Sequence, residues 1–165
     1  MDELREKLAL KKIYPVPSEK VMYRYSHEGI LIDFIPFEET PLGPTNSWLK
    51  PGFKKAYPVN IGEIEIKILP VSLFLATKWK AFKSRGSDPR TSPDFEDIIY
   101  IIDNHKEVVE DVRNANQDVK EYLNEMSNEI LKHPSRNEII ECHINPFTVD
   151  ERRAIVIEKL NELLK

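Results

Sequence analysis

Residues 69–103 read LPVSLFLATKWKAFKSRGSDPRTSPDFEDIIYIID, and this stretch decides the fold. Its apolar side chains recur at helical spacing, which predicts helices over about residues 70–84 and 93–103. Ser92 followed by Pro93 is a typical helix start, with serine as the N-cap and proline at the first helical position. The chain therefore contains at least two consecutive helices near its middle.

The remainder of the second half continues the helical pattern. We expect a long helix over about residues 105–131, a weaker one near 136–142 and a last one over 149–164. The pair Asn104-His105 indicates a break between helices, and Pro134 ends the long helix. Residues 70–165 are therefore expected to be all-helical.

The first half has the composition of strands, with aromatic and β-branched runs between Pro and Gly residues. In the last run isoleucines alternate with charged residues, which is typical of a half-buried strand. The expected segments are a short helix at 1–12, a hairpin of extended runs at 21–26 and 29–36, a loop with turns at 38–54, and a second extended pair at 56–59 and 61–68.

Length and composition limit the class of protein. The chain has 165 residues, 41% hydrophobic and 32% charged, with a net charge of −4. This fits one compact α+β unit in which a sheet region (1–69) is followed by a helical region (70–165) packed on it. A single cysteine, Cys142, excludes an internal disulfide framework. No apolar run approaches a membrane span of roughly 18 residues, and the N-terminus lacks the apolar centre of a signal peptide. We therefore expect a cytoplasmic protein that does not bind membranes.

Asp33 is the first candidate functional residue. It lies in the run GILIDFIP at 29–36, whose other members are almost all apolar. A carboxylate in such a strand is costly to bury unless it is paired, hydrogen-bonded or bound to a metal. An edge strand with Asp33 pointing to water explains the pattern equally well, so the residues alone leave both interpretations open.

Lys78 and Arg85 are the second candidates. On a helical wheel Lys78 falls within the apolar stripe formed by Phe74, Leu75 and Phe82, and Arg85 lies on the same face. Two cations on a core-facing stripe can extend past the core to reach water. They can equally project into a cleft and hold an anion such as phosphate.

Asp97 follows in a region of opposite charge. Residues 76–90 carry five bases and one acid, whereas residues 94–111 carry seven acids and one base. This order suits a site that binds phosphates beside an acid, and it is equally the pattern of two helices joined by salt bridges. Asp97 lies opposite the expected core stripe of its helix, so it is a solvated acid or lines a second interface. That core stripe consists of Phe95, Ile98, Ile99 and Ile102.

Four strings in this order carry a family resemblance. They are IDFIP at 32–36, LGxxNSW at 42–48, LPxxxFLATKWKAF at 69–82 and RGxDxRxSxDxEDI at 85–98. Together they resemble the nucleotidyltransferase-like proteins of the AbiEii toxin type, known from toxin–antitoxin pairs of bacteria and archaea. The resemblance covers roughly residues 1–125.

The resemblance implies a polymerase-β-like nucleotidyltransferase fold that transfers a nucleotide from an NTP to an acceptor, which is tRNA in some of these toxins. It also implies Mg²⁺ held by strand carboxylates. By position, Asp33 resembles the strand carboxylate that binds the metal and acts on the acceptor hydroxyl. Lys78 resembles the helix lysine that contacts the triphosphate, and Asp97 resembles the downstream acid of the catalytic set.

One part of the family pattern has no counterpart before Asp33. The family places a Gly-Ser turn and an Asp-x-Asp strand there, and residues 1–32 contain neither. We therefore expect catalysis to be impaired, or to depend on a companion chain that supplies the missing strands. The alternatives are a non-catalytic nucleotide- or RNA-binding or regulatory protein, and a dimeric remnant of the fold. An open sheet edge would favour a homodimer.

Overall fold

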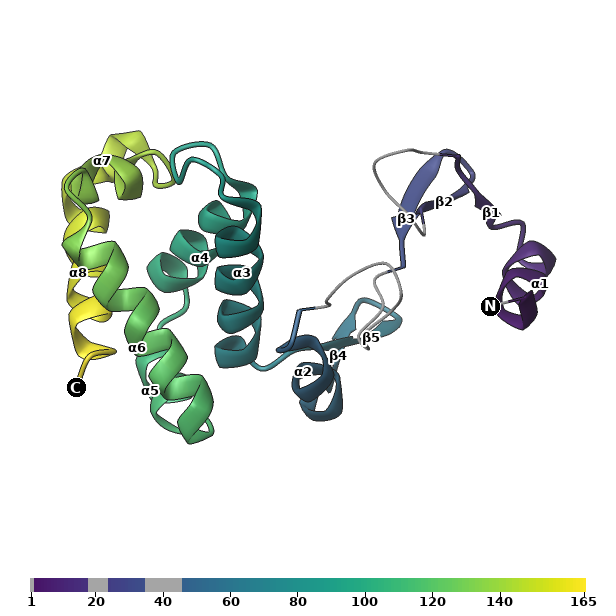
Figure 1. Ribbon diagram of the computed structural model, residues 1–165, viewed down its shortest axis with the longest axis horizontal. Coiled ribbons are helices and arrows are strands. Elements are labelled where there is room, and N and C mark those ends of the chain that lie inside the picture. The colour runs from purple at the N-terminus through teal and green to yellow at the C-terminus, as the bar shows by residue number, and fades with distance from the viewer. Residues whose placement is uncertain (1, 18–23, 35–45) are drawn as a thin grey trace. The chain divides into compact units, whose positions relative to one another are not determined.

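The computed structural model is of mixed α+β type and describes residues 2–17, 24–34 and 46–165 (Figure 1). The chain divides into two compact units, Met1–Thr45 and Asn46–Lys165. The sequence expectation divides one compact unit into regions 1–69 and 70–165. The second hairpin therefore belongs to the same unit as the helices.

The first unit holds a short helix and a small antiparallel sheet. Its elements are α1 (Asp2–Leu10), β1 (Tyr14–Pro15), β2 (Arg24–His27) and β3 (Ile30–Asp33), with strand order β1-β2-β3. The expected hairpin is confirmed in its described part, with Arg24 opposite Asp33 and His27 opposite Ile30. Glu28 and Gly29 both have positive φ in the connecting turn, as a type I′ turn requires. Residues 21–23, 35 and 36 of the expected runs lie outside the described residues.

The second unit begins with a helix and a hairpin, α2 (Leu49–Lys55), β4 (Tyr57–Ile61) and β5 (Ile64–Ile68). The expected loop at 38–54 is wrong for residues 49–54, and residues 38–45 lie outside the described part of the chain. Pro51 is tolerated because it occupies the first turn of α2, where backbone N–H groups have no helical partner. Gly52 is buried and packs close to Leu69: a Cβ atom at residue 52 would lie 3.0 Å from Leu69 Cδ2.

The rest of the second unit is helical. The elements are α3 (Val71–Arg85), α4 (Pro93–Asn104), α5 (Val108–Arg113), α6 (Gln117–Lys132), α7 (Arg136–Glu141), the short 3-10 helix η1 (Pro146–Thr148) and α8 (Val149–Glu162). The expected helices are confirmed, except that the long helix at 105–131 is two helices. The break falls at Asn114 to Asn116, and Asn116 is extended as the N-cap residue of α6. Asparagine favours such caps because its side chain competes with helical backbone bonds.

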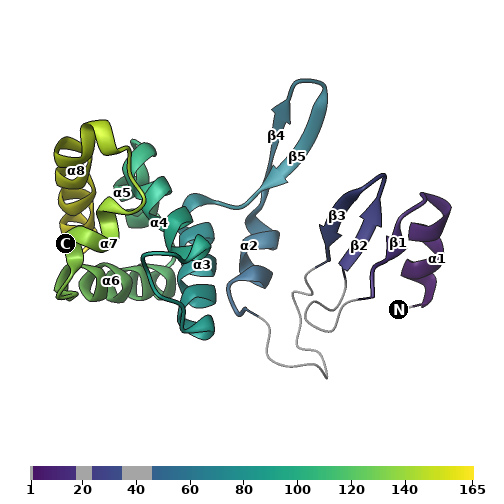
Figure 2. The same ribbon diagram turned by 90° about the horizontal axis from the view of Figure 1, so that it is seen from above.

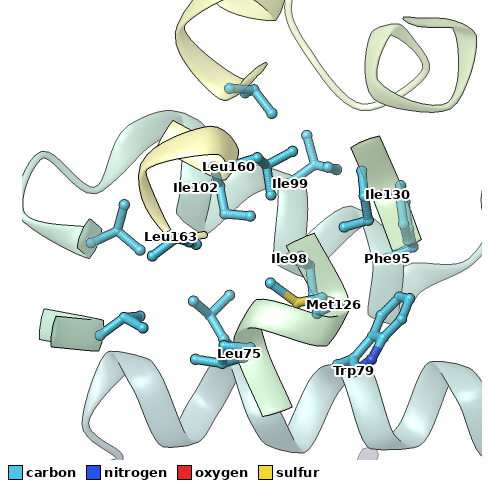
Figure 3. Close-up of a cluster of buried hydrophobic side chains, with 14 of the residues drawn as sticks. Leu75, Trp79, Phe95, Ile98, Ile99, Ile102, Met126, Ile130, Leu160 and Leu163 are labelled. Atoms are coloured by element: carbon cyan, nitrogen blue, oxygen red, sulfur yellow. The ribbon is translucent and has the colours of Figure 1, made fainter. Parts of the chain in front are cut away.

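The apolar core of this unit lies where the helices from α3 to α8 meet (Figure 3). Leu75 of α3, Met126 of α6 and Leu160 of α8 are all fully buried. The expected stripe of α4 is confirmed, since Phe95, Ile98, Ile99 and Ile102 are at most 1% exposed. Among the described residues, no helix has the length and apolar character needed to cross a membrane.

Helix α8 holds the C-terminal end of α4. Lys159 Nζ donates to the carbonyl oxygens of Ile102, Asp103 and His105 at 2.7, 3.1 and 3.1 Å. Arg152 Nη2 donates to the Asp103 carbonyl at 2.9 Å, and its Nε lies 2.7 Å from the Asp103 carboxylate. Cations at a helix C-terminus satisfy carbonyls that lack helical partners and interact favourably with the helix dipole. These contacts fix α4 and with it the acids of its first turns.

The isoleucines of β5 depart from the sequence expectation. Ile64 and Ile66 alternate with charged residues as a half-buried strand would, yet they are 68% and 38% exposed. The reason is that the β4–β5 ribbon extends away from helices α3–α8 (Figure 2). The hairpin itself is confirmed, with Tyr57 opposite Ile68 and Ile61 opposite Ile64.

Candidate functional site

The candidate site is a group of four charged side chains on α3 and α4, which we call the α3–α4 charge cluster: Lys78, Arg85, Asp94 and Asp97. Lys78 Nζ lies 2.6 Å from Asp97 Oδ2 and 3.6 Å from Asp94 Oδ1. Arg85 Nη1 donates to Asp94 Oδ2. The structure thus joins the three residues that the sequence singled out on these helices, with Asp94 as a fourth.

The cluster has an inner and an outer side. The Asp94 side chain is 5% exposed, whereas those of Lys78 and Asp97 are 27% and 44% exposed. Asp94 lies in the first turn of α4, after the N-cap Ser92, where the helix dipole stabilises a negative charge. Asp97 follows one turn later on the same face. Lys78 therefore contacts one buried carboxylate and one that solutes can reach.

Lys78 lies at the border of the core rather than in the middle of a buried stripe. The buried side chains of α3 are Ser72, Leu73, Leu75, Ala76 and Trp79. Phe74 and Phe82, which the sequence grouped with Lys78, are only partly buried. Lys78 Nζ lies 5.6 Å from the centre of the Phe74 ring, within cation–π range. The prediction that Lys78 lies in the middle of the buried stripe is therefore wrong. The buried face of α3 is centred on residues such as Leu73 and Ala76 instead.

The connection between α3 and α4 is anchored to helix α7 and the residues after it. Arg90 binds Glu138 through two hydrogen bonds of 2.8 and 3.0 Å, which lower the pKa of Glu138. His143 Nε2 lies 2.6 Å from the Pro89 carbonyl oxygen. A fixed connection holds the N-terminus of α4, and therefore Asp94, against the C-terminal turn of α3.

Asp33 belongs to the first unit, whereas the α3–α4 charge cluster belongs to the second. Arg24 of the neighbouring strand donates to its two carboxylate oxygens at 2.7 and 2.8 Å. This bidentate pair lowers the pKa of Asp33 below its usual value. Strand β3 is at the edge of the described sheet, and its carboxylate has an arginine partner there.

Asp33 is the residue that the family resemblance assigns to a magnesium ion. In this arrangement each of its two carboxylate oxygens accepts one hydrogen bond from Arg24. Across residues 2–17, 24–34 and 46–165, no three His, Cys, Asp or Glu side chains are grouped as metal ligands.

Asp94 is the member of the cluster that sequence reasoning missed as a site residue. Its position in the first turn of α4 was evident, and an acid there usually interacts with the helix end in water. The available signal was its spacing of three residues from Asp97, which places both carboxylates on one helix face. Its burial could only be found from the packing of α3 on α4.

Comparison with known proteins identifies no relative of this chain. No protein-family model, curated protein or solved structure matches this chain.

Proposed function

We propose that the chain handles a nucleoside triphosphate, as a protein of nucleotidyltransferase type, and that Lys78 binds the phosphates. The carrying observation is the position of Lys78 between a buried and a partly exposed carboxylate. The buried Asp94 keeps the lysine in place, while a ligand from solution can replace the partly exposed Asp97 as its partner. The resemblance of residues 69–98 to nucleotidyltransferase-like toxins supports the same role.

Charge balance explains how a phosphate can enter the cluster. Two cations and two carboxylates give it no net formal charge, and Arg85 remains with Asp94 when Lys78 changes partner. A triphosphate carries several negative charges on adjacent oxygens and therefore competes strongly with the single carboxylate of Asp97 for the ammonium group. Asp97 would then lie free beside the bound phosphates, where the family resemblance places an acid.

A second candidate function is nucleotide binding without transfer by this chain alone. The observation that favours it is the bidentate Arg24–Asp33 pair, which engages the carboxylate that the resemblance assigns to the acceptor hydroxyl. Incubation with labelled NTP, Mg²⁺ and tRNA separates the two candidates. Label on tRNA would support transfer, whereas saturable binding without label would support the second candidate.

Replacing Lys78 by methionine is expected to weaken NTP binding by about tenfold or more, because a charge-assisted contact to phosphate is lost while the aliphatic part is retained. Lys80→Met is the matched control, since Lys80 is an exposed lysine on the same helix. It should change the affinity by less than about twofold.

Asp97→Asn should strengthen NTP binding, because it removes the carboxylate that competes with the phosphates for Lys78. Isothermal titration with each of the four NTPs measures all three effects.

Equal affinity of the Lys78→Met and Lys80→Met proteins would contradict the assignment of Lys78. Weaker binding by Asp97→Asn would contradict the exchange of partners. An unchanged circular dichroism spectrum for each variant is the control that its helix content is that of the wild type.

A further inference from the structure

The β4–β5 hairpin has one apolar and one polar face. The register places Tyr57 opposite Ile68, Val59 opposite Ile66 and Ile61 opposite Ile64 on one face. The other face carries Pro58 opposite Lys67 and Asn60 opposite Glu65. Ile61 and Ile64 are 63% and 68% exposed at the tip of the apolar face. Exposed apolar faces of this kind usually mark an interaction surface.

The two edges of the hairpin differ in their capacity to pair. Gly62 and Glu63 form a two-residue turn with Gly62 at positive φ, and such a turn closes on a hydrogen-bonded pair, here Ile61 and Ile64. Hydrogen-bonded and non-hydrogen-bonded pairs then alternate, so the backbone groups of Pro58 point away from β5. Proline has no N–H, and the outer edge of β4 is therefore blocked for pairing.

The outer edge of β5 has no such block. By the same alternation, Glu65 and Lys67 direct their backbone N–H and C=O groups away from β4. Within the described residues, β5 pairs with β4 alone. Unpaired edges of this kind are templates for a further strand.

We propose that the β5 edge binds a second copy of this chain, with the two β5 strands antiparallel and Ile66 opposite the partner's Ile66. In this register Glu65 lies opposite the partner's Lys67, and Lys67 lies opposite the partner's Glu65. Both pairs occupy hydrogen-bonded positions, where the two residues exchange N–H···O bonds. A two-fold axis produces each contact twice, as symmetric dimers require.

Charge complementarity selects this register. A shift of two residues in one direction places Glu65 opposite the partner's Glu65, and a shift in the other direction places Lys67 opposite the partner's Lys67. Like charges directly opposite each other destabilise a strand pair, whereas opposite charges stabilise it. The selected register also brings the two Ile66 side chains together at a non-hydrogen-bonded pair, where side chains approach closest.

This inference is independent of the proposed nucleotide function. Residues 64–68 lie outside the α3–α4 charge cluster, so either proposal can fail while the other holds. The dimer would form a four-stranded sheet in the order β4-β5-β5-β4, with the proline-bearing strands at both outer edges.

Reversing the charge of Glu65 or Lys67 tests the strand pairing, with the dimer dissociation constant measured by sedimentation equilibrium. Glu65→Lys and Lys67→Glu are each expected to raise the dimer dissociation constant by about tenfold, because each creates two like-charge pairs. An equimolar mixture of these two variants should restore wild-type association, since the heterodimer has only opposite charges in register. The double variant Glu65→Lys/Lys67→Glu should also associate like the wild type. Glu63→Lys, in the turn outside the ladder, is the control and should change nothing.

A disulfide provides the second readout. In a Cys142→Ser background, Ile66→Cys should form an intermolecular disulfide under mild oxidation, because Cα atoms about 4.5 Å apart are within disulfide range. Val59→Cys on β4 is the control and should remain reduced. A wild-type chain that stays monomeric at millimolar concentration would overturn the proposal. So would a dimer that responds equally to Glu63→Lys and Glu65→Lys, or one that crosslinks better through Val59→Cys.

Discussion

Replacing Phe95 by alanine is expected to lower the free energy of unfolding of residues 46–165 by about 3–5 kcal/mol. The Phe95 side chain is 1% exposed, and its ring centre lies 5.3 Å from that of Phe82 and 5.6 Å from that of His143. Truncation removes buried apolar surface and leaves a cavity between α3, α4 and the residues after α7. Contacts among helices limit how far the site can collapse to fill it.

Urea denaturation followed by tryptophan fluorescence measures this loss. Both tryptophans of the chain, Trp48 and Trp79, lie in the second unit, so the signal reports on that unit. Tyr100→Ala is the matched control, because Tyr100 is on the same helix and 60% exposed. It should change the free energy of unfolding by less than about 0.5 kcal/mol. A loss below about 1 kcal/mol for Phe95→Ala would contradict the described packing of α4.

Replacing Lys159 by methionine is expected to cost about 1–3 kcal/mol of the free energy of unfolding. The ammonium group donates to three carbonyl oxygens at the end of α4, and methionine fills similar space without a donor. Glu158→Met, at an exposed neighbouring position of α8, is the control and should have little effect. A loss equal to that of the control would show that the carbonyls do not depend on Lys159.

Lys159 should also make the free energy of unfolding depend on pH. Burial lowers the pKa of Lys159 below 10.5, so between the folded pKa and 10.5 the unfolded chain binds more protons at this position than the folded chain. Folding stability at such a group rises with pH across that window. The difference in free energy of unfolding between the wild type and Lys159→Met should therefore widen as the pH rises through this window toward 10.5.

Local sequence patterns were sufficient for most of the secondary structure. Helices α3 and α4 have strong periodicity and clear start and stop residues, and both were predicted within two residues of their ends. Helix α2 was missed because Pro51 and Gly52 are usual loop residues. Only the structure shows that Pro51 falls in the first turn of a helix and that a Cβ at residue 52 would lie 3.0 Å from Leu69 Cδ2. The strands β4 and β5 were predicted, but their exposure was not, because exposure depends on what packs on the hairpin.

The candidate site was predictable only in part, because helical patterns show which residues share a helix face but not how two helices pack. Lys78 was singled out by its place on a helical wheel and Asp97 by its place in the family resemblance, and the structure places Lys78 Nζ 2.6 Å from Asp97 Oδ2. Asp94 was missed because its burial arises from helix packing, which the sequence pattern does not report. The pairing of Asp33 with Arg24 depends on strand register, which the hairpin turn sets and the residue types alone do not.

Labelling with an acyl-phosphate derivative of ATP or GTP tests most directly whether Lys78 contacts nucleotide phosphates. An amine beside the γ-phosphate attacks the acyl carbonyl, so that an amide forms and the nucleotide leaves. Peptide mass spectrometry then identifies the acylated lysine. Lys78 is expected to be labelled in preference to Lys80 and to be protected by excess unmodified NTP. Labelling of Lys78 that is no faster than that of Lys80, and that does not respond to NTP, would contradict the proposed function.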